Sequence, residues 1–231
     1  MYKNKKILGV TLARGGSKST PKKNIVDING IPLIGYTIRE ALNSRYLDRF
    51  IVSTDCVEIK KVSERLGANV PFVRPNELST DSATSADALL HAVNYMEGRG
   101  YKYDYVVELM ATNPLKDQTD IDGMIEQTID NEEHSCVAVH RLIEHHPSRI
   151  KYIENNYLKP FYPEIPESRR QDLHPLAYIR SGSIYVVSVQ FLKTNNSRYS
   201  SDQTRAYVLA DDKVCNLDEP ADLALLRERL K

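Results

Sequence analysis

The stretch from Gly9 to Asn24 combines residue types that could bind phosphate. A short apolar run that begins at Ile7 leads into the paired glycines Gly15 and Gly16. Glycines at this point would let backbone N–H groups approach an anion without interference from a Cβ atom. Arginine offers a phosphate a planar fork of donors, and lysine offers a point charge. The cations available in this stretch are Arg14, Lys18, Lys22 and Lys23.

Two widely used phosphate motifs are absent from this stretch. A Walker loop requires glycine at the positions that Leu12 and Ser17 occupy before Lys18, and the pattern Gly-x-Gly-x-x-Gly does not occur there either. The same residues would also suit a solvated basic turn, because glycine and lysine are ordinary loop residues. The stretch alone therefore leaves a polyphosphate site and a simple basic turn as alternatives.

Composition limits the classes of partner. The chain has 231 residues, with 31 Lys plus Arg and 31 Asp plus Glu, so no overall field attracts it to nucleic acid or to an anionic membrane. The three scattered cysteines form neither a disulfide framework nor a Cys-x-x-Cys metal motif. We do not interpret the lysine-flanked segment at residues 3–13 as a secretory signal, and no apolar run reaches membrane-spanning length. We expect a cytoplasmic protein.

Hydrophobic periodicity predicts an α/β fold. Apolar runs predict strands from residue 7 and over 49–53, 70–73, 105–109, 137–139, 183–189 and 206–209, with helical periodicity over 33–42, 59–66, 86–96, 119–129 and 223–230. This alternation predicts a mostly parallel sheet with helices on both faces, in one domain over residues 1–231. Ligands of such sheets bind beyond the carboxyl ends of the strands, where we expect Arg14, Asp55, Arg74 and Thr112-Asn113.

Two polar segments allow both a structural and a functional interpretation. The hydroxyl cluster from Ser79 to Ser85 could be a substrate loop or the cap of the next helix. Asp218 could be the N-cap of the last helix, or Asn216 and Asp218 could share one face of an extended segment and bind magnesium through oxygen. Both roles can coexist at Asp218.

Residues 141–180 interrupt the alternating pattern. The segment is rich in proline and in basic residues, and its scattered aromatic residues argue against disorder because they favour burial. We interpret it as an arm, inserted in the single domain, that packs against a partner subunit and carries basic residues towards the site.

Several motifs in colinear order resemble the CMP-sialic acid synthetases, the acylneuraminate cytidylyltransferases. They are residues 13–18 with 21–24 (ARGGSK, PKKN), 51–55 (IVSTD), 74–75 (RP) with Asp81 and Ser85, and 182–185 (GSIY). The resemblance covers nearly the whole chain and implies a Rossmann-like nucleotidyltransferase sheet. It also implies a homodimeric enzyme that uses CTP and Mg²⁺ to activate a small 2-keto-3-deoxy sugar acid. Phosphoryl attack of this kind depends on positioning and on charge neutralisation by Arg, Lys and a metal.

The resemblance assigns expected roles residue by residue. It implies nucleotide contacts from Arg14, Gly15, Ser17, Lys18, Lys23, Asn24, Arg74, Ala83 and Ser85. It implies sugar contacts from Thr112, Asn113, Arg149, Arg170, Gly182 and Tyr185, with Arg170 reaching over from the neighbouring subunit. The catalytic residues would be Arg14, Lys23 and Asp218, with Asp218 also the candidate general base, and the metal ligands would be Asp218 and Asn216.

Three departures from the family pattern bear on the substrate. Asn216-Leu217-Asp218 stands where the family commonly has Asp-x-Asp, residues 110–114 (MATNP) replace Gln-Pro-Thr-Ser-Pro, and residues 179–182 (IRSG) replace Arg-Pro-Asn-Gly. These changes favour a modified nonulosonic acid, of legionaminic or pseudaminic type, over N-acetylneuraminate. The alternatives are a CMP-octulosonate synthetase, a nucleotide-sugar glycosyltransferase and, because of Asn216, a nucleotide-binding protein without catalysis.

Overall fold

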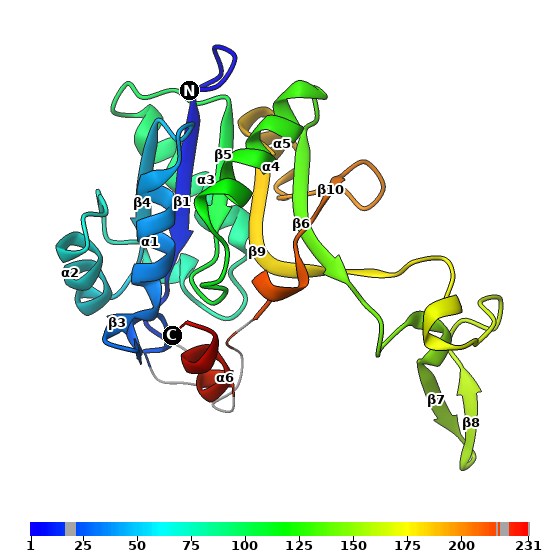
Figure 1. The fold of residues 1–231 in the computed structure, drawn as a ribbon. Helices are drawn as coiled ribbons and strands as arrows, with labels where there is room; N and C mark the ends of the chain where they lie inside the picture. Colours follow the sequence, from blue (N-terminus) through cyan, green and yellow to red (C-terminus); the bar gives the residue numbers. More distant parts are fainter. Residues whose placement is uncertain (17–21, 216, 218–221, 231) are drawn as a thin grey trace.

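A six-stranded sheet forms the centre of the chain in the computed structural model, which describes residues 1–16, 22–215, 217 and 222–230 (Figure 1). The order of the strands across the sheet is β10-β6-β9-β5-β1-β4. Their bounds are β1 Ile7–Leu12, β4 Arg49–Ser53, β5 Tyr105–Leu109, β6 Ser135–Arg141, β9 Tyr178–Ser188 and β10 Arg205–Val208. β1 pairs in parallel with β4 and β5, and β10 with β6, whereas β9 runs antiparallel to both of its neighbours. The predicted mostly parallel sheet is confirmed.

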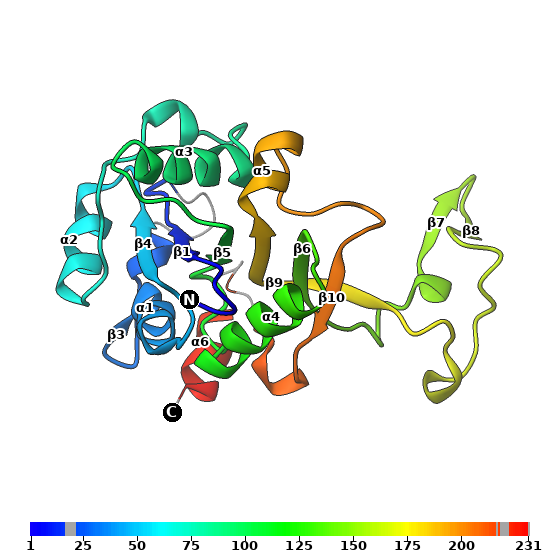
Figure 2. The same ribbon diagram turned by 90° about the horizontal axis from the view of Figure 1, so that it is seen from above.

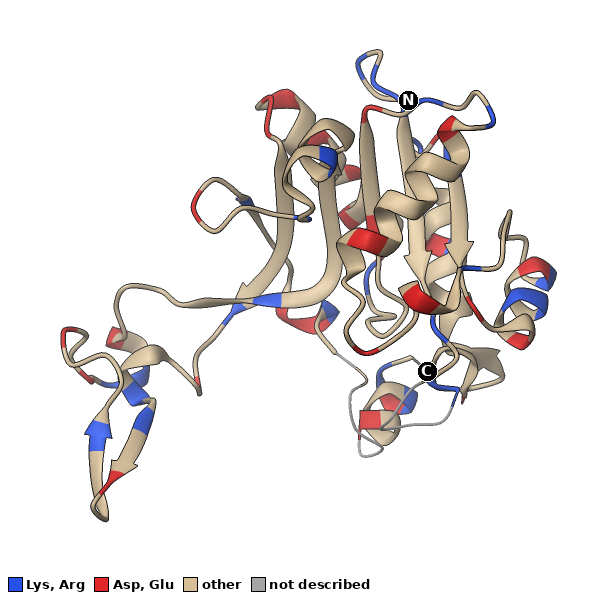
Figure 3. Cartoon of the chain, turned by 180° about the vertical axis from the view of Figure 1, so that it is seen from behind, with Lys and Arg blue, Asp and Glu red and all other residues tan. Residues whose placement is uncertain are grey.

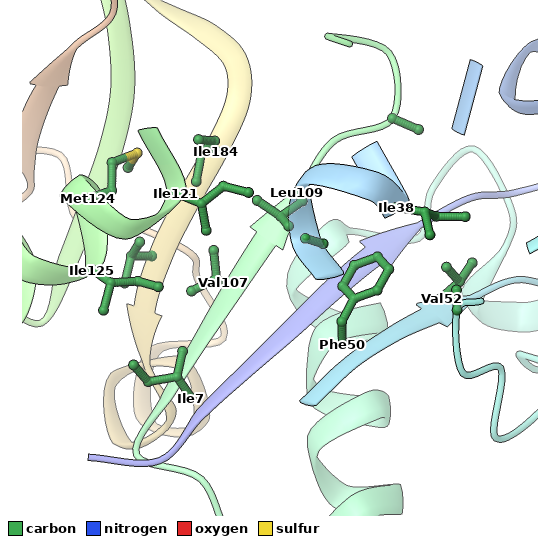
Figure 4. Packing of buried hydrophobic residues seen from close by; sticks show 14 of the residues in the cluster. Ile7, Ile38, Phe50, Val52, Val107, Leu109, Ile121, Met124, Ile125 and Ile184 are labelled. Atoms are coloured by element: carbon green, nitrogen blue, oxygen red, sulfur yellow. The ribbon is translucent and has the colours of Figure 1, made fainter. Parts of the chain in front are cut away.

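Helices cover both faces of the sheet, as expected for strands that are apolar on both sides (Figure 2). One face is covered by α3 (Ser85–Glu97) and α5 (Val189–Asn195), and the other by α1 (Leu33–Asn43), α2 (Val57–Arg65) and α4 (Gln118–Asp130). Figure 4 shows Ile121, Met124 and Ile125 of α4 packed over Val107 and Leu109 of β5. A smaller cluster joins α6 (Asp222–Arg229) to the short hairpin of β2 (Asp27–Ile28) and β3 (Ile31–Pro32).

The N-terminus of α4 shows how local sequence sets an element boundary. Asp117 is the N-cap and accepts the backbone N–H groups of Thr119 and Asp120 at 2.9 and 3.1 Å. Partial burial alone would raise the pKa of Asp117, but hydrogen bonds from Lys213 and Thr119 lower this pKa to about 2. Lys213 lies after β10, so its bond to the cap residue Asp117 connects the start of α4 to that later segment.

The strand predicted over residues 70–73 is not present, and this prediction was wrong. Within this segment only Val73 forms a bridge, to Thr54, while Asn69 pairs singly with Ile51. Pro71 lies inside the segment and has no N–H to donate to a ladder, which accounts for the interruption. The segment still brings Arg74 to the edge of the sheet, because the Arg74 N–H donates to the Thr54 carbonyl at 2.7 Å.

Between β6 and β9 the chain leaves the sheet over residues 142–177, which lie within the arm predicted at 141–180. Its main feature is an antiparallel hairpin of β7 (Lys151–Glu154) and β8 (Tyr157–Pro160), which stands away from the sheet in Figures 1 and 2. Figure 3 shows basic and acidic residues close together along it. The predicted excursion is therefore present, but it contains a regular hairpin. No helix in the described part of the chain is long and apolar enough to cross a membrane.

Candidate active site

A pocket of about 210 Å³ opens at the carboxyl ends of β1 and β5. It lies at the edge of the sheet where the sequence predicted a site, because parallel strands bring their carboxyl ends together. Its walls come from the end of β1, the loop before α3, β5 and the turn after β5. The lining residues include Leu12, Arg14, Arg74, Ser79, Thr80, Asp81, Ala83, Ser85, Ala88, Glu108, Met110, Ala111 and Thr112.

Arg14 lies at the mouth of this pocket. Its guanidinium donates to an Asp81 carboxylate oxygen at 2.8 Å and to the Thr80 carbonyl at 3.3 Å. Both partners of the ion pair are well exposed, with 38% of the Arg14 side chain and 53% of the Asp81 side chain accessible. Exposed pairs contribute little stability, so an anion in the pocket could take over the guanidinium at small cost.

Arg74 supplies the second guanidinium, and it is buried. Only 4% of the residue is exposed, and Nε donates to the Ser79 hydroxyl at 2.9 Å. Burial lowers the pKa of Arg74, and the Asp55 carboxylate, 3.9 Å away, acts in the opposite direction. Asp55 also accepts the Gly15 N–H at 2.9 Å. The carboxylate thus links the glycine loop to the buried arginine, and the two predicted cations, Arg14 and Arg74, line the same pocket.

The hydroxyl cluster before α3 forms the helix cap that the sequence allowed, and its role as a substrate loop stays a prediction. Thr84 caps α3 by accepting the Asp87 N–H at 3.1 Å, and the Asp87 carboxylate accepts the Thr84 N–H in return. Ser79, Ala83 and Ser85 line the pocket at the same time. The cap fixes the loop, and the loop presents small and polar groups to the pocket.

Lys23 connects the glycine loop to the C-terminal segment. Its Nζ donates to the Leu217 carbonyl at 2.7 Å, and the residue is only 9% exposed. The Leu217 N–H in turn donates to the Thr112 carbonyl at 2.9 Å. Asn24 donates to the Arg14 carbonyl at 3.1 Å, which holds the backbone of the loop. Three segments that are far apart in sequence therefore meet beside the pocket.

Comparison with known proteins identifies the family of the chain. The family model described as cytidylyltransferase matches residues 8–222, which is nearly the whole chain and includes every wall of the pocket. The chain belongs to the cytidylyltransferase family. It is a CTP-dependent nucleotidyltransferase, and the matched residues include Arg14, Arg74 and the other residues that line the pocket.

Curated relatives match along the length of this cytidylyltransferase. A pseudaminic acid cytidylyltransferase of Campylobacter jejuni is 35% identical over 94% of this chain and 93% of its own. A CMP-N,N'-diacetyllegionaminic acid synthase of Legionella pneumophila is 29% identical over 98% and 97%. An N-acylneuraminate cytidylyltransferase of Escherichia coli is 29% identical over 95% of this chain and 51% of its own.

Solved structures of similar fold include a CMP:2-keto-3-deoxy-manno-octonic acid synthetase complexed with CTP. It matches with a TM-score of 0.73 and 20% identity, over 97% of this chain and 98% of the other. A 4-diphosphocytidyl-2C-methyl-D-erythritol synthase matches with a TM-score of 0.65 and 13% identity, over 99% and 100%. At these identities the likeness concerns the fold, which agrees with the nucleotidyltransferase sheet predicted from the sequence.

The predicted sugar residues of this cytidylyltransferase differ in their placement. Thr112 lines the pocket, whereas Asn113 is fully buried and its side-chain amide donates to the Ser181 carbonyl at 3.4 Å. Gly182 lies in β9 with a φ of +61°, a backbone conformation that favours glycine. Tyr185 is buried in the neighbouring part of β9 and does not line the pocket. Sugar contacts by these residues remain predictions.

Arg149 and Arg170 lie on the arm, away from the pocket of their own chain. Arg149 lies 4.0 Å from Glu167 and donates to the Ser168 carbonyl at 3.5 Å. Arg170 pairs with Glu144 at 3.3 Å. Neither residue lines the pocket, so a sugar contact from either would have to come from another copy of the chain.

Four predicted site residues lie outside the described part of the chain. They are Ser17, Lys18, Asn216 and Asp218. Within the described residues, no group of three or more His, Cys, Asp or Glu side chains could hold a metal ion. The predicted metal ligands, Asn216 and Asp218, are not among the described residues.

Two buried charges beside the pocket were not predicted. Glu108 lines the pocket floor, is 2% exposed and pairs with Arg198 at 2.5 Å. Burial raises the pKa of Glu108, and Arg198, which also stacks on the Tyr185 ring at 4.2 Å, acts in the opposite direction. A single acidic residue within the apolar run at 105–109 is the signal that could have identified this pair. The second buried charge, Lys116, carries no comparable signal.

Proposed function

We propose that this cytidylyltransferase activates a nonulosonic acid of sialic, legionaminic or pseudaminic type with CTP. The anomeric hydroxyl of the sugar would attack the α-phosphate, so that a sugar oxygen–phosphorus bond forms, the α–β phosphoanhydride bond breaks and pyrophosphate leaves. The names of the curated relatives support this substrate class. The observation that carries the proposal is the single pocket that Arg14, Arg74 and the turn containing Thr112 share.

The contacts of the basic residues suggest a different role for each of them. Arg14 can move from the exposed Asp81 to a phosphate group, whereas Arg74 is held in place by Ser79 and suits a fixed contact with the cytidine side. Lys23 is buried next to the loop and is the candidate for neutralising the charge that develops on the leaving pyrophosphate. Gly15, Asn24, Ala83 and Ser85 complete the proposed nucleotide site, with Ser17 and Lys18 as further candidates from the sequence.

We assign the magnesium site to Asn216 and Asp218. Leu217, which lies between them in the sequence, is bonded to Lys23 and to Thr112, and Thr112 lines the pocket. An amide oxygen and a carboxylate suit a hard cation such as Mg²⁺. A bound Mg²⁺ would neutralise charge on the triphosphate. Asp218 is also the candidate general base.

The arm supports a homodimer as part of this proposal. Its hairpin and the segment that follows expose large apolar side chains, including Ile153, Tyr157, Leu158 and Phe161 at 54–74% exposure. We treat residues 1–231 as one cytidylyltransferase domain whose arm, residues 141–180, docks on a second copy and brings Arg170 to the sugar site of that copy. Leu158→Asp should convert a dimer into a monomer in a light-scattering measurement, and a monomeric wild type would refute the homodimer.

A pyrophosphate-release assay tests the proposed reaction. The enzyme is incubated with Mg²⁺, each nucleoside triphosphate in turn and a panel of pseudaminic, legionaminic, N-acetylneuraminic and 3-deoxy-octulosonic acids. We expect release with CTP and a nonulosonic acid, and we place the reaction in the cytoplasm, where thiols such as the three free cysteines stay reduced. Release with the octulosonate alone would overturn the substrate class, and CTP binding without release would favour the non-catalytic alternative.

A further inference from the structure

Lys116 is a buried cation whose hydrogen bonds are fully matched. The residue is 1% exposed, and its ammonium group lies at the centre of three oxygen acceptors. The acceptors are the Asn113 carbonyl at 2.6 Å, the Met110 carbonyl at 2.7 Å and the Thr37 hydroxyl at 2.8 Å. An ammonium group has three donors, so each donor has one partner.

The charge of Lys116 has no direct carboxylate partner in the described part of the chain. Burial lowers the pKa of Lys116 to about 7, and Asp120 and Glu40 act in the opposite direction. A buried ammonium without a paired carboxylate is costly, and the two backbone carbonyls are the groups that offset this cost.

The turn that Lys116 holds is part of the pocket. Its two carbonyl partners belong to Met110 and Asn113, the first and last residues of the turn after β5, and residues 110–112 line the pocket. Within the same turn, the Thr112 carbonyl accepts the Leu217 N–H at 2.9 Å, and the Leu217 carbonyl accepts Lys23 Nζ at 2.7 Å. A continuous chain of contacts therefore runs from Lys116 through the turn to Lys23.

We propose that Lys116 is a positioning residue for nucleotidyl transfer, which clamps the turn at residues 110–113 so that Leu217 and Lys23 are held in place beside the pocket. The inference rests on the proposed function, because it assigns the turn and Lys23 to the reacting end of the site. Lys116 has no hydrogen bond to Arg74 or Ser79, which also line the pocket. Loss of the clamp should therefore lower kcat while leaving CTP affinity nearly unchanged.

Substitution of Lys116 by Met tests the clamp. Methionine fills a similar volume but removes the ammonium donor, so that the Asn113 carbonyl loses its bond to Lys116 and the Met110 carbonyl keeps only the Asn113 N–H at 3.4 Å. We expect the variant to fold, to bind CTP within twofold of wild type by calorimetry and to lose at least tenfold in kcat. Lys116→Arg retains the charge and the donors and should exceed the Met variant in kcat by threefold or more. Lys193→Met is the control, because Lys193 is a surface lysine bonded to the Glu97 carboxylate and does not line the pocket.

A readout that is independent of turnover separates this inference from the proposed function. Hydrogen exchange at the Leu217 amide should be faster in the Met variant, whereas the Ala13 amide, bonded to the Ser53 carbonyl, should be unchanged. If the wild type does not turn over any nonulosonic acid, the proposed function fails, and the exchange result still decides whether the clamp exists.

Two outcomes would overturn the proposal. The first is a folded Lys116→Met enzyme with wild-type kcat and wild-type exchange at Leu217. The second is loss of folding in both Lys116→Met and Lys116→Gln, which would show that Lys116 is only a structural group. If the Met variant alone does not fold, the Gln variant takes its place, with the same expected loss of kcat and retention of CTP binding.

Discussion

The exposed ion pair at the mouth of the pocket predicts that Asp81→Asn will bind CTP more tightly. In the free enzyme the Arg14 guanidinium donates to Asp81 at 2.8 Å, and the proposed triphosphate contact requires Arg14 to leave this partner. Pairs with side chains as accessible as these contribute up to about 1 kcal/mol, and we take about 0.5–1 kcal/mol for this short contact. Removal of the competing carboxylate should therefore lower the Kd for CTP about two- to fivefold.

Isothermal titration of CTP into the Asp81→Asn enzyme measures this change. The difference from wild type should shrink as salt is raised, because the pair is exposed to solvent. Asp130→Asn is the matched control, since Asp130 pairs with Lys3 at 2.8 Å with similar exposure, at the opposite end of the sheet. A Kd that stays the same or rises in Asp81→Asn would refute the reasoning, because it would show that Arg14 does not exchange Asp81 for the nucleotide.

Three further predictions follow from individual contacts. Lys23→Ala should lower kcat about 10²–10³-fold in pyrophosphate release, whereas Lys22→Ala, which breaks only a surface pair, should stay near wild type. Glu108→Gln leaves Arg198 without its carboxylate and should lower the free energy of unfolding, measured with urea, by about 3 kcal/mol. An unchanged free energy of unfolding would contradict a buried ion pair. Asp117→Ala should cost about 1 kcal/mol by loss of the α4 cap. The folded-state pKa of Asp117 lies near 2, below the pKa of this carboxyl in the unfolded chain. Its contribution to the free energy of unfolding is therefore fully present above the unfolded-state pKa and is lost as pH falls through about 2. The free energy of unfolding of the Ala variant, measured in urea, should therefore fall less steeply as the pH is lowered.

The sequence was sufficient for the elements that have strong periodicity. The strands at 49–53 and 105–109 were predicted at their observed bounds, because each is a short apolar run that ends in a polar segment. The hairpin at 151–160 was missed, since its strands are mostly exposed and show no buried alternation. Its turn did carry a signal: Asn155 and Asn156 both have positive φ, as a two-residue hairpin turn requires, and asparagine tolerates this conformation.

Some features of the candidate site were likewise predictable from the sequence, and others were not. The convergence of Arg14 and Thr112 on one pocket was predictable, because the parallel strands β1 and β5 end at the same edge of the sheet; Arg74 reaches this edge without the predicted strand, through the bond from its N–H to the Thr54 carbonyl. The contacts that stabilise the site were not predictable from local patterns. The bond from Lys23 to Leu217 joins residues 194 positions apart, and Lys116 reaches Thr37 across 79. No spacing rule links such residues until the sheet and the helices around it are in place.

Identification of the product tests whether this enzyme transfers a cytidylyl group to a nonulosonic acid. The enzyme is incubated with CTP, Mg²⁺ and pseudaminic acid, the sugar named for the 35% identical relative, and the products are resolved by mass spectrometry and ³¹P NMR. We expect a CMP-linked sugar with a single phosphodiester phosphorus and an equal amount of pyrophosphate. Should the enzyme release phosphate or pyrophosphate without any CMP-sugar, from this or another nonulosonic acid, the assignment of the pocket to nucleotidyl transfer onto these sugars would be contradicted.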